Sequence, residues 1–250
     1  MVLTPILCPD CGSDNVRKNG HCSSGKQRYL CKNAKCSRKT FALEYTYHAY
    51  DPNVRKAVYE HAVNGSGTRA TARILKINKD TVTRLLKKKE SLLSQVNEDY
   101  INRNCKQGFE IDLVRVEEAE ADEMWSFVQN KKNQLWLWWI IDHKTGEPLA
   151  YCFGTKEHIY LDELRKILRS SRIKIKTIYT DGNQAYLKIT ESKVVQGKRN
   201  TQKIESKHTA LRTWCSRLVR KGIRFSKTIE MHKIAVGLVI NFWFFGRVLW

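Results

Sequence analysis

The sequence has no apolar segment long and continuous enough to cross a lipid bilayer. Its longest apolar stretches, Leu135–Ile141 and Ile234–Phe245, are too short or too interrupted for that purpose. The first residues, MVLTPILCPDCG, lack the basic region, continuous apolar core and small-residue cleavage site of a secretion signal. These absences argue against a membrane-spanning or secreted protein, and we expect a soluble intracellular one. In that compartment the eight cysteines are not expected to form disulfides.

Acidic residues are scarce relative to basic ones. The 250 residues contain 25 Asp and Glu but 45 Lys and Arg, so the formal net charge is +20. The basic residues are spread over most of the chain, which predicts a polyanionic partner. Charge alone does not distinguish DNA from RNA or from an anionic membrane, because each presents dense negative charge. The motifs must therefore identify the partner.

The sequence has no internal repeat and no low-complexity tract, but its character changes along the chain. Its length suits a small recognition region followed by one catalytic domain. Residues 1–45 contain five of the eight cysteines with short β-prone stretches, which is typical of a metal-stapled unit. Residues 46–90 have helical patterns without cysteine, and residues 91–118 are polar and end in an acidic run. We predict a zinc ribbon, a helix-turn-helix domain and a linker, in that order.

Residues 119–250 are expected to form the catalytic domain. Their pattern predicts three strands, a helix, a further strand and a last helix, at Met124–Val128, Leu135–Asp142, Leu149–Phe153, His158–Ser170, Thr177–Thr180 and Lys203–Lys221. Three meandering strands before a crossover helix fit a mixed sheet with helices packed against it, which is the ribonuclease-H-like arrangement. The expected fold is therefore multidomain: a zinc ribbon and an all-α helix-turn-helix, followed by an α/β ribonuclease-H-like domain.

Four cysteines have the spacing of metal ligands. Cys8 and Cys11 form one pair, Cys31 and Cys36 form another, and 19 residues separate the pairs. Two such pairs complete a tetrahedral zinc site, and a closed four-sulfur site is structural because it leaves no open position. Unrelated buried or free thiols are the alternative, which fits the spacing less well. His21 and Cys22 are possible substitutes for one ligand. We interpret the remaining cysteines as buried small residues rather than ligands: Cys105, Cys152 and Cys215.

Within residues 46–90 we predict helices at Val54–Val63, Thr68–Leu75 and Lys79–Lys89. Apolar residues of the last two would pack across a tight turn, while eight Lys and Arg against two acids occupy residues 68–90. The last helix is the candidate for the major groove of DNA. A helical hairpin with a solvated basic face is the alternative, and the preceding zinc ribbon argues against it. The candidate DNA-binding residues are Arg69, Arg73, Lys79, Thr81, Thr83, Arg84, Lys87 and Lys88.

Three carboxylates form a candidate catalytic set. Asp122 lies where the acidic run meets the first strand, and Asp181 follows the strand that ends in TIYT. Glu205 is the only acid between Lys198 and Arg224, among nine Lys and Arg. If its helix packs beside the two strands, the three side chains can hold two divalent cations, Mg²⁺ or Mn²⁺, for phosphoryl transfer.

Other residues near these positions have simpler interpretations. Glu120 and Glu123 flank Asp122 and fit a solvated acidic run. Asp142 ends a strand, where Asp commonly starts a turn. His208 follows Glu205 by one helical turn, and we interpret it as an exposed or phosphate-contacting side chain rather than as a catalytic one.

The chain resembles a transposase of the insertion-sequence-one family, with both parts in one reading frame. In the first half the resemblance rests on CPDCG, NGH, GKQRYLC, KTF and GTRATARIL. In the second half it rests on ADEMWSFV, TDGNQAY, TQKIESKH and FSKTIEMH. It covers nearly the whole chain, so the motifs together identify the family.

The resemblance implies both an activity and a set of site residues. Family members are DNA strand-transfer enzymes whose first half recognises the terminal inverted repeats of the element. The catalytic triad would fall on Asp122, Asp181 and Glu205, and the basic residue seven positions after the Glu on Arg212. We expect terminal-repeat and target DNA as partners, at least a dimer when two ends are synapsed, and a cytoplasmic, nucleoid-associated protein of a prokaryotic host. The alternatives are a catalytically silent DNA-binding regulator and a structure-specific nuclease.

Overall fold

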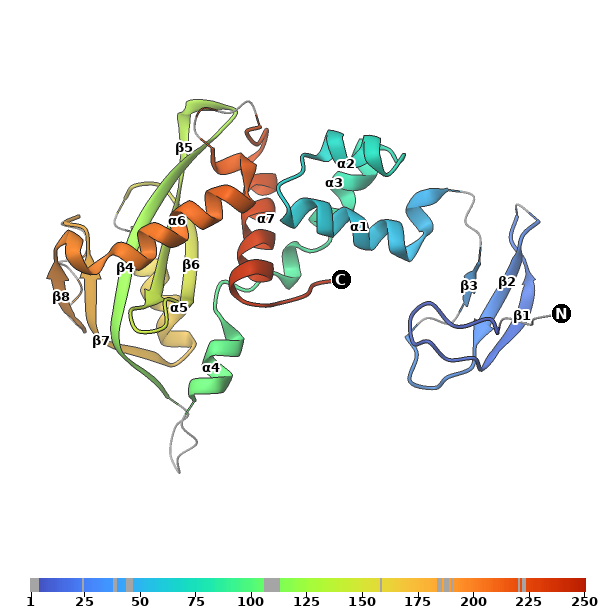
Figure 1. Ribbon diagram of the computed structural model, residues 1–250, viewed down its shortest axis with the longest axis horizontal. Coiled ribbons are helices and arrows are strands. Elements are labelled where there is room, and N and C mark those ends of the chain that lie inside the picture. The colour runs from blue at the N-terminus through green and yellow to red at the C-terminus, as the bar shows by residue number, and fades with distance from the viewer. Residues whose placement is uncertain are drawn as a thin grey trace.

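The structure is a computed structural model of the chain. It describes residues 5–23, 25–37, 40–43, 47–105, 113–157, 159–183, 186, 189, 191–219, 221 and 224–250. Figure 1 shows a small N-terminal sheet, a group of helices and a larger sheet that follow one another along the longest axis of the molecule. The multidomain layout expected from the sequence is confirmed.

The N-terminal unit is a three-stranded antiparallel sheet with a very small core. Its strands are β1 (Val16–His21), β2 (Gln27–Cys31) and β3 (Thr40–Ala42), in the order β1-β2-β3. The core consists mainly of Tyr29 and Phe41, whose rings stack 5.7 Å apart, and of two cysteines. So little apolar surface does not hold a fold in place by itself, which is why such units depend on a metal.

The next unit contains a short 3₁₀ helix, η1 (His48–Tyr50), and three α-helices, α1 (Pro52–Val63), α2 (Thr68–Ile74) and α3 (Lys79–Lys87). The three helices predicted from the sequence are confirmed, although α3 ends two residues before the predicted Lys89. Lys76, in the turn between α2 and α3, has a φ of 51°, the left-handed conformation that glycine often supplies. Asn78 then caps α3 by accepting a hydrogen bond from the Asp80 amide at 2.7 Å.

Residues 91–118, expected as a linker, contain regular structure where they are described. A 3₁₀ helix, η2 (Glu90–Leu92), and a helix, α4 (Glu98–Asn104), come first, and strand β4 begins at Val114. Tyr100 of α4 is 3% exposed and belongs to the core of the large sheet. Although the segment is mostly polar, Tyr100 packs against residues that are distant in the sequence.

The large sheet has five strands. These are β4 (Val114–Val128), β5 (Asn130–Asp142), β6 (Pro148–Gly154), β7 (Ile173–Thr180) and β8 (Lys193–Gln196), in the order β6-β5-β4-β7-β8. The β4–β5 and β5–β6 pairs are antiparallel, whereas β4–β7 and β7–β8 are parallel. The predicted mixed sheet is therefore confirmed. Strand β8 was not predicted, and β4 was predicted ten residues too short.

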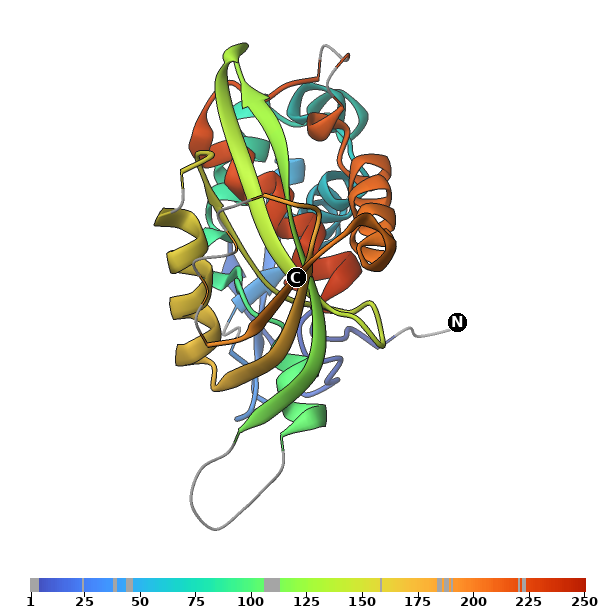
Figure 2. The same cartoon turned by 90° about the vertical axis from the view of Figure 1, so that its left-hand side faces the viewer.

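Helices cover both faces of this sheet. Helix α5 (Ile159–Ser170) packs on one face, and α6 (Gln202–Trp214) and α7 (Ile229–Val239) pack on the other (Figure 2). Short 3₁₀ turns, η4 (Lys198–Asn200) and η5 (Ser216–Leu218), precede and follow α6. The helix predicted at Lys203–Lys221 thus ends earlier, at Trp214. None of the described helices is long and apolar enough to cross a membrane.

Helix α7 lies between the helix-turn-helix and the large sheet (Figure 1). Its residues Ile234 and Leu238 share a core with α1 to α3, whereas Val236 and Val239 share a core with the sheet. The helix is buried nearly all round and continues as a π-helical turn, η6 (Ile240–Phe244). The helix-turn-helix and the large sheet are therefore joined through α7, which contributes apolar residues to both cores. No helix was predicted here, because a segment without a polar face has no helical periodicity.

Candidate zinc, DNA-binding and catalytic sites

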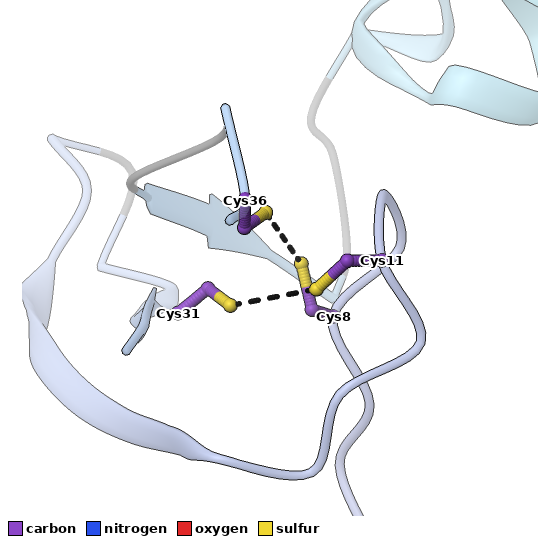
Figure 3. A group of neighbouring side chains, drawn as sticks. All are labelled: Cys8, Cys11, Cys31 and Cys36. Atoms are coloured by element: carbon purple, nitrogen blue, oxygen red, sulfur yellow. Dashed lines mark hydrogen bonds between the residues drawn. The ribbon is translucent and has the colours of Figure 1, made fainter. Parts of the chain in front are cut away.

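The four predicted cysteine ligands converge in the N-terminal unit. The Sγ atoms of Cys8 and Cys36 are 3.7 Å apart, as are those of Cys11 and Cys31, and all four lie within 4.8 Å of one another (Figure 3). Four sulfurs at about 2.3 Å from a tetrahedral zinc ion would be about 3.8 Å apart. The set therefore fits structural Zn²⁺. His21 and Cys22 are not members of this group within the described part of the chain.

The basic face of the helix-turn-helix is largely open. The predicted side chains are exposed at Arg69, Arg73, Lys79, Arg84, Lys87 and Lys88, and half-buried at Thr81 and Thr83. Two of the predicted residues have internal partners that were not foreseen. The Thr81 hydroxyl lies 3.1 Å from the hydroxyl of Tyr47, and Lys87 forms an ion pair with Glu230 of α7 at 2.6 Å. Lys87 therefore faces the catalytic half.

The strand register brings Asp122 and Asp181 together. Strand β4 pairs with β7 in parallel, with Glu120 opposite Tyr179, so two residues further along Asp122 comes beside Asp181. Asp181 directly follows the last residue of β7 and is exposed, whereas Asp122 lies inside β4 and is 9% exposed. One carboxylate is thus fixed by the sheet, and the other is open to solvent at the end of a strand.

A third carboxylate, that of Glu123, lies close to this pair. Oxygen atoms of Asp122, Glu123 and Asp181 all lie within 4.8 Å of one another. Neighbouring strand residues point to opposite faces, so Glu123 approaches from the α5 side of the sheet. There it accepts hydrogen bonds from the amide of Asn183 at 2.7 Å and the hydroxyl of Tyr186 at 3.1 Å. The interpretation of Glu123 as part of a solvated acidic run was wrong, and no sequence pattern distinguished it from its neighbours.

The electrostatics of the site show crowded negative charge. Burial, reinforced by the charge of Asp181, raises the pKa of Asp122 to about 7. Burial likewise raises the pKa of Glu123. The pKa of the buried Tyr186 is also raised, by burial and by the charge of Glu123, so its hydroxyl stays protonated and donates a hydrogen bond to that carboxylate. Such clustering of carboxylate oxygens is typical of a site for hard divalent cations.

Helix α6 brings two further side chains toward Asp122. Nδ1 of His208 lies 3.4 Å from Oδ2 of Asp122, and His208 is 7% exposed. The interpretation of His208 as an exposed side chain was therefore wrong. Glu205 lies one turn earlier on the helix and is exposed. It is not a member of the group within 4.8 Å, but its charge contributes to raising the pKa of Asp122. Arg212, two turns after Glu205, is half-buried.

Glu120 has a structural contact that the sequence did not reveal. It is 0% exposed, and its Oε2 accepts a hydrogen bond of 2.8 Å from the amide of Ile204 in the first turn of α6. Its Oε1 lies 2.7 Å from Nδ1 of His143. A carboxylate at a helix N-terminus is stabilising, so Glu120 anchors α6 to β4, and its interpretation as a solvated residue was wrong. Asp142 accepts a hydrogen bond from the Thr145 amide at 2.8 Å, which confirms its predicted role in a turn.

A cysteine-held metal site, a helix-turn-helix and a sheet edge with converging carboxylates together define a DNA-binding protein with a candidate catalytic half. Comparison with known families specifies which one. Residues 115–246 match the family described as IS1 transposase, residues 45–90 match the InsA C-terminal domain, and residues 1–36 match the InsA N-terminal domain. The chain belongs to the IS1 transposase family, as its resemblance indicated.

One curated protein and one solved structure are similar to the chain to different degrees. The insertion element iso-IS1n protein InsB of Shigella dysenteriae is 38% identical over 123 residues, which cover 49% of this chain and 93% of that protein. A chain of the simian T-cell lymphotropic virus intasome in complex with PP2A regulatory subunit B56 gamma is 13% identical, with a TM-score of 0.33. That match covers 74% of this chain and 67% of the other. The second likeness is too low to carry an argument.

Proposed function

We propose that this protein is a DDE-type transposase that cleaves DNA at the ends of an insertion element and joins the freed 3′ ends to target DNA. The observation that carries the proposal is the convergence of Asp122 and Asp181 beside α6, the helix that bears Glu205. Membership of the IS1 transposase family supports it. An antiparallel β4–β5–β6 meander extended by parallel β7 and β8 further supports a ribonuclease-H-like catalytic domain.

Asp122, Asp181 and Glu205 are assigned as the ligands of two divalent cations, Mg²⁺ or Mn²⁺. Their carboxylate oxygens are the donors that these hard ions prefer. When bound, such a pair of ions stabilises the attacking and leaving oxygens of an in-line phosphoryl transfer. The single site would serve both cleavage and joining.

The choice of Glu205 over Glu123 rests on hydrogen bonding. Both oxygens of Glu123 already accept hydrogen bonds, from Asn183 and Tyr186. The carboxylate of Glu205 makes no hydrogen bond or ion pair with the described residues. It is exposed on the same helix as His208, which reaches Asp122. Glu205 is therefore available to a cation, whereas Glu123 has a supporting role.

The other parts of the chain bind DNA. The helix-turn-helix, with α3 in the major groove, and the zinc ribbon recognise the terminal inverted repeats. Arg212 contacts a phosphate near the reacting strand, and at least a dimer is needed to hold two ends. The catalytic domain extends N-terminally beyond residue 119, because α4 and the whole of β4 contribute to its sheet and core. The protein acts in the cytoplasm on nucleoid DNA.

The test is a strand-cleavage and strand-transfer assay on labelled terminal-repeat DNA with Mg²⁺ or Mn²⁺. Glu205→Gln keeps the volume and hydrogen-bonding capacity of the side chain but removes its charge. It should reduce nicked and joined products together by several orders of magnitude, while DNA-end binding survives. Glu123→Gln should cause a smaller loss. Glu191→Gln is the control and should be close to wild type, since Glu191 pairs with Arg165 and Arg169 beside α5.

Three results would contradict the proposal. Near-normal activity of Glu205→Gln with full loss of activity in Glu123→Gln would identify Glu123, and not Glu205, as the third metal ligand. Cleavage of branched DNA without joining would indicate a nuclease. Binding of terminal repeats by wild-type protein without any cleavage would indicate a regulator.

A further inference from the structure

A cleft of about 510 Å³ lies beside the carboxylates, on the α5 side of the sheet. We call it the Trp136 cleft, and its lining consists of Lys132, Gln134, Trp136, Thr155, Lys156, Glu157 and Asn183. Asn183 connects it to the candidate catalytic site, because its amide donates a hydrogen bond to Glu123. Lys156 also connects the cleft to this site, because its positive charge lowers the pKa of Glu123 and so opposes the effect of burial. A group bound in the cleft would therefore lie next to whatever reacts at Asp122 and Asp181.

The indole of Trp136 is the main apolar surface of this cleft. It is half-buried, and it packs against the core formed by the sheet and α5. That packing fixes the ring while leaving part of it open. Nζ of Lys156 lies over the ring, 5.4 Å from its centroid, in a cation–π contact. A base that stacks on this face would displace the flexible Lys156 side chain toward its own phosphate. A large aromatic side chain in this position, next to charged residues, resembles a stacking platform.

Four of the remaining lining residues are suited to a nucleotide, and Glu157 adds one exposed carboxylate. Lys132 and Lys156 are exposed cations that can contact a phosphate. Gln134 and Thr155 are exposed and carry hydrogen-bond donors and acceptors that suit the edge of a base. The cleft is largely open to solvent, and its volume of about 510 Å³ is within the range of small-ligand pockets, about 300–1,000 Å³. The cleft thus has a flat apolar surface, polar groups and cations within one small space.

We propose that the Trp136 cleft binds one unpaired nucleotide of the DNA strand that is cleaved, with its base stacked on Trp136 and its phosphate near Lys132 and Lys156. The inference rests on the proposed function, since it is this function that brings DNA to the adjacent carboxylates. A base within a duplex is stacked on both faces and has no face free for an indole, so the bound nucleotide must be unpaired. The cleft would hold the DNA end open beside the phosphodiester that reacts.

The experiment compares the affinity of the full-length, zinc-loaded protein for two DNAs without added divalent cation. One is a blunt duplex, and the other is the same duplex with a short oligothymidine overhang. Wild type should prefer the overhang about 5- to 150-fold, the range expected for stacking of one base on an aromatic ring. Trp136→Ala should remove this preference while leaving affinity for the blunt duplex unchanged. Trp136→Phe should keep most of it, which also guards against an effect of misfolding.

Charge and location are tested separately. Lys156→Gln should reduce the preference and lower the salt dependence of overhang binding by about one unit of slope. Lys166→Gln removes a charge from an exposed position of α5 outside the cleft and should behave as wild type. With 5-iododeoxyuridine in the overhang, irradiation should attach the DNA to the peptide that contains Trp136.

The inference is wrong if wild type shows no preference, if Trp136→Ala retains it, or if the cross-link maps to another surface. Saturation of the cleft by free thymidine monophosphate at micromolar concentration would also overturn it, because the site would then be one for a free nucleotide. Strand cleavage is a separate readout. A preference that depends on Trp136 in a protein unable to cleave would contradict the proposed function alone, and active protein without the preference would contradict this inference alone.

Discussion

The indole Nε1 of Trp139 donates a hydrogen bond of 2.8 Å to Nε2 of His208. Because Nε2 accepts this bond, the proton of the neutral imidazole is on Nδ1. That nitrogen lies 3.4 Å from Oδ2 of Asp122. The planes of the two rings are nearly parallel, with an angle of 7° between them. Trp139 on β5 therefore fixes the orientation and the tautomer of a histidine on α6, which in turn contacts the buried carboxylate.

His208→Ala should reduce strand cleavage about 10- to 100-fold, the range seen when a residue that orients a metal ligand is removed. DNA-end binding should be unchanged, because the helix-turn-helix is not altered. Trp139→Phe removes the hydrogen bond but keeps an aromatic ring, and it should cause a smaller loss. Thermal unfolding of both variants separates loss of orientation from loss of folding. Thr213→Ala, exposed on the same helix, is the control, and an equal loss of cleavage in it would argue against a specific role of His208.

Removal of zinc should unfold only the N-terminal unit. We expect about one equivalent of zinc per chain, and Cys8→Ser or Cys31→Ser should release it and unfold residues 1–45. The core of this unit shares no residues with the others, so the rest of the chain should remain folded. All seven tryptophans lie between residues 125 and 250, outside the N-terminal unit, so their fluorescence reports on the rest of the chain and should not change.

Cys22→Ser is the matched control for the zinc site, and it should keep the metal because Cys22 lies outside the group of four cysteines. Elemental analysis measures the bound zinc, and proteolysis follows the unfolding of the ribbon. Folded protein without zinc would contradict the assignment.

Features encoded by short spacing could be predicted from the sequence. The ligand pairs that begin at Cys8 and Cys31, and the helices up to Lys87, depend on residues close together in the chain. The positions of Asp122 and Asp181 at strands were also foreseen, because apolar strands precede or contain them. Local patterns are sufficient where the physical cause is local.

Features that depend on distant partners could not be predicted. Glu120 and Glu123 have the same local surroundings in the sequence, yet one caps α6 and the other accepts hydrogen bonds from Asn183 and Tyr186. Likewise, α7 has no polar face because its two sides pack against different halves of the chain. Strand β8 depends on pairing with β7 rather than on its own pattern.

Arg84 and Lys88 should contribute differently to DNA binding if α3 lies in the major groove as proposed. Arg84 is nearer the base edges, so Arg84→Ala should cost about 1–3 kcal/mol and reduce discrimination between terminal repeats and other DNA. Lys88 lies at the end of the helix, so Lys88→Ala should weaken all sequences alike and flatten the salt dependence. Fluorescence anisotropy at several salt concentrations measures both effects.

Lys87→Ala serves as a comparison, since Lys87 pairs with Glu230 and should matter less for DNA affinity than Lys88. Its exposed ion pair contributes only about 0–1 kcal/mol to stability, so the variant should fold normally. An equal loss of discrimination in the Arg84 and Lys88 variants would show that the helix is oriented differently.

His232 should make the protein less stable in acid. It is 0% exposed on α7, between the hydroxyls of Ser126 at 3.0 Å and Ser226 at 3.1 Å. Burial, with a further effect of the Arg217 charge, lowers its pKa to about 4. In the unfolded chain the pKa of histidine is about 6.5, so the unfolded state binds the proton more readily. Stability should therefore fall as the pH decreases from about 6.5 to about 4, by about 3 kcal/mol from this residue.

The raised pKa values of Asp122 and Glu123 act in the opposite direction, because their protonation in acid favours the folded state. The contribution of His232 must therefore be measured as a difference between two proteins. His232→Gln keeps a neutral side chain able to bond to both serines but cannot take up a proton in this range. Urea unfolding of wild type and variant between pH 4 and pH 7 gives the two free-energy curves. The stability of wild type relative to the variant should fall as the pH is lowered, and parallel curves would mean that His232 is not the group that senses acid.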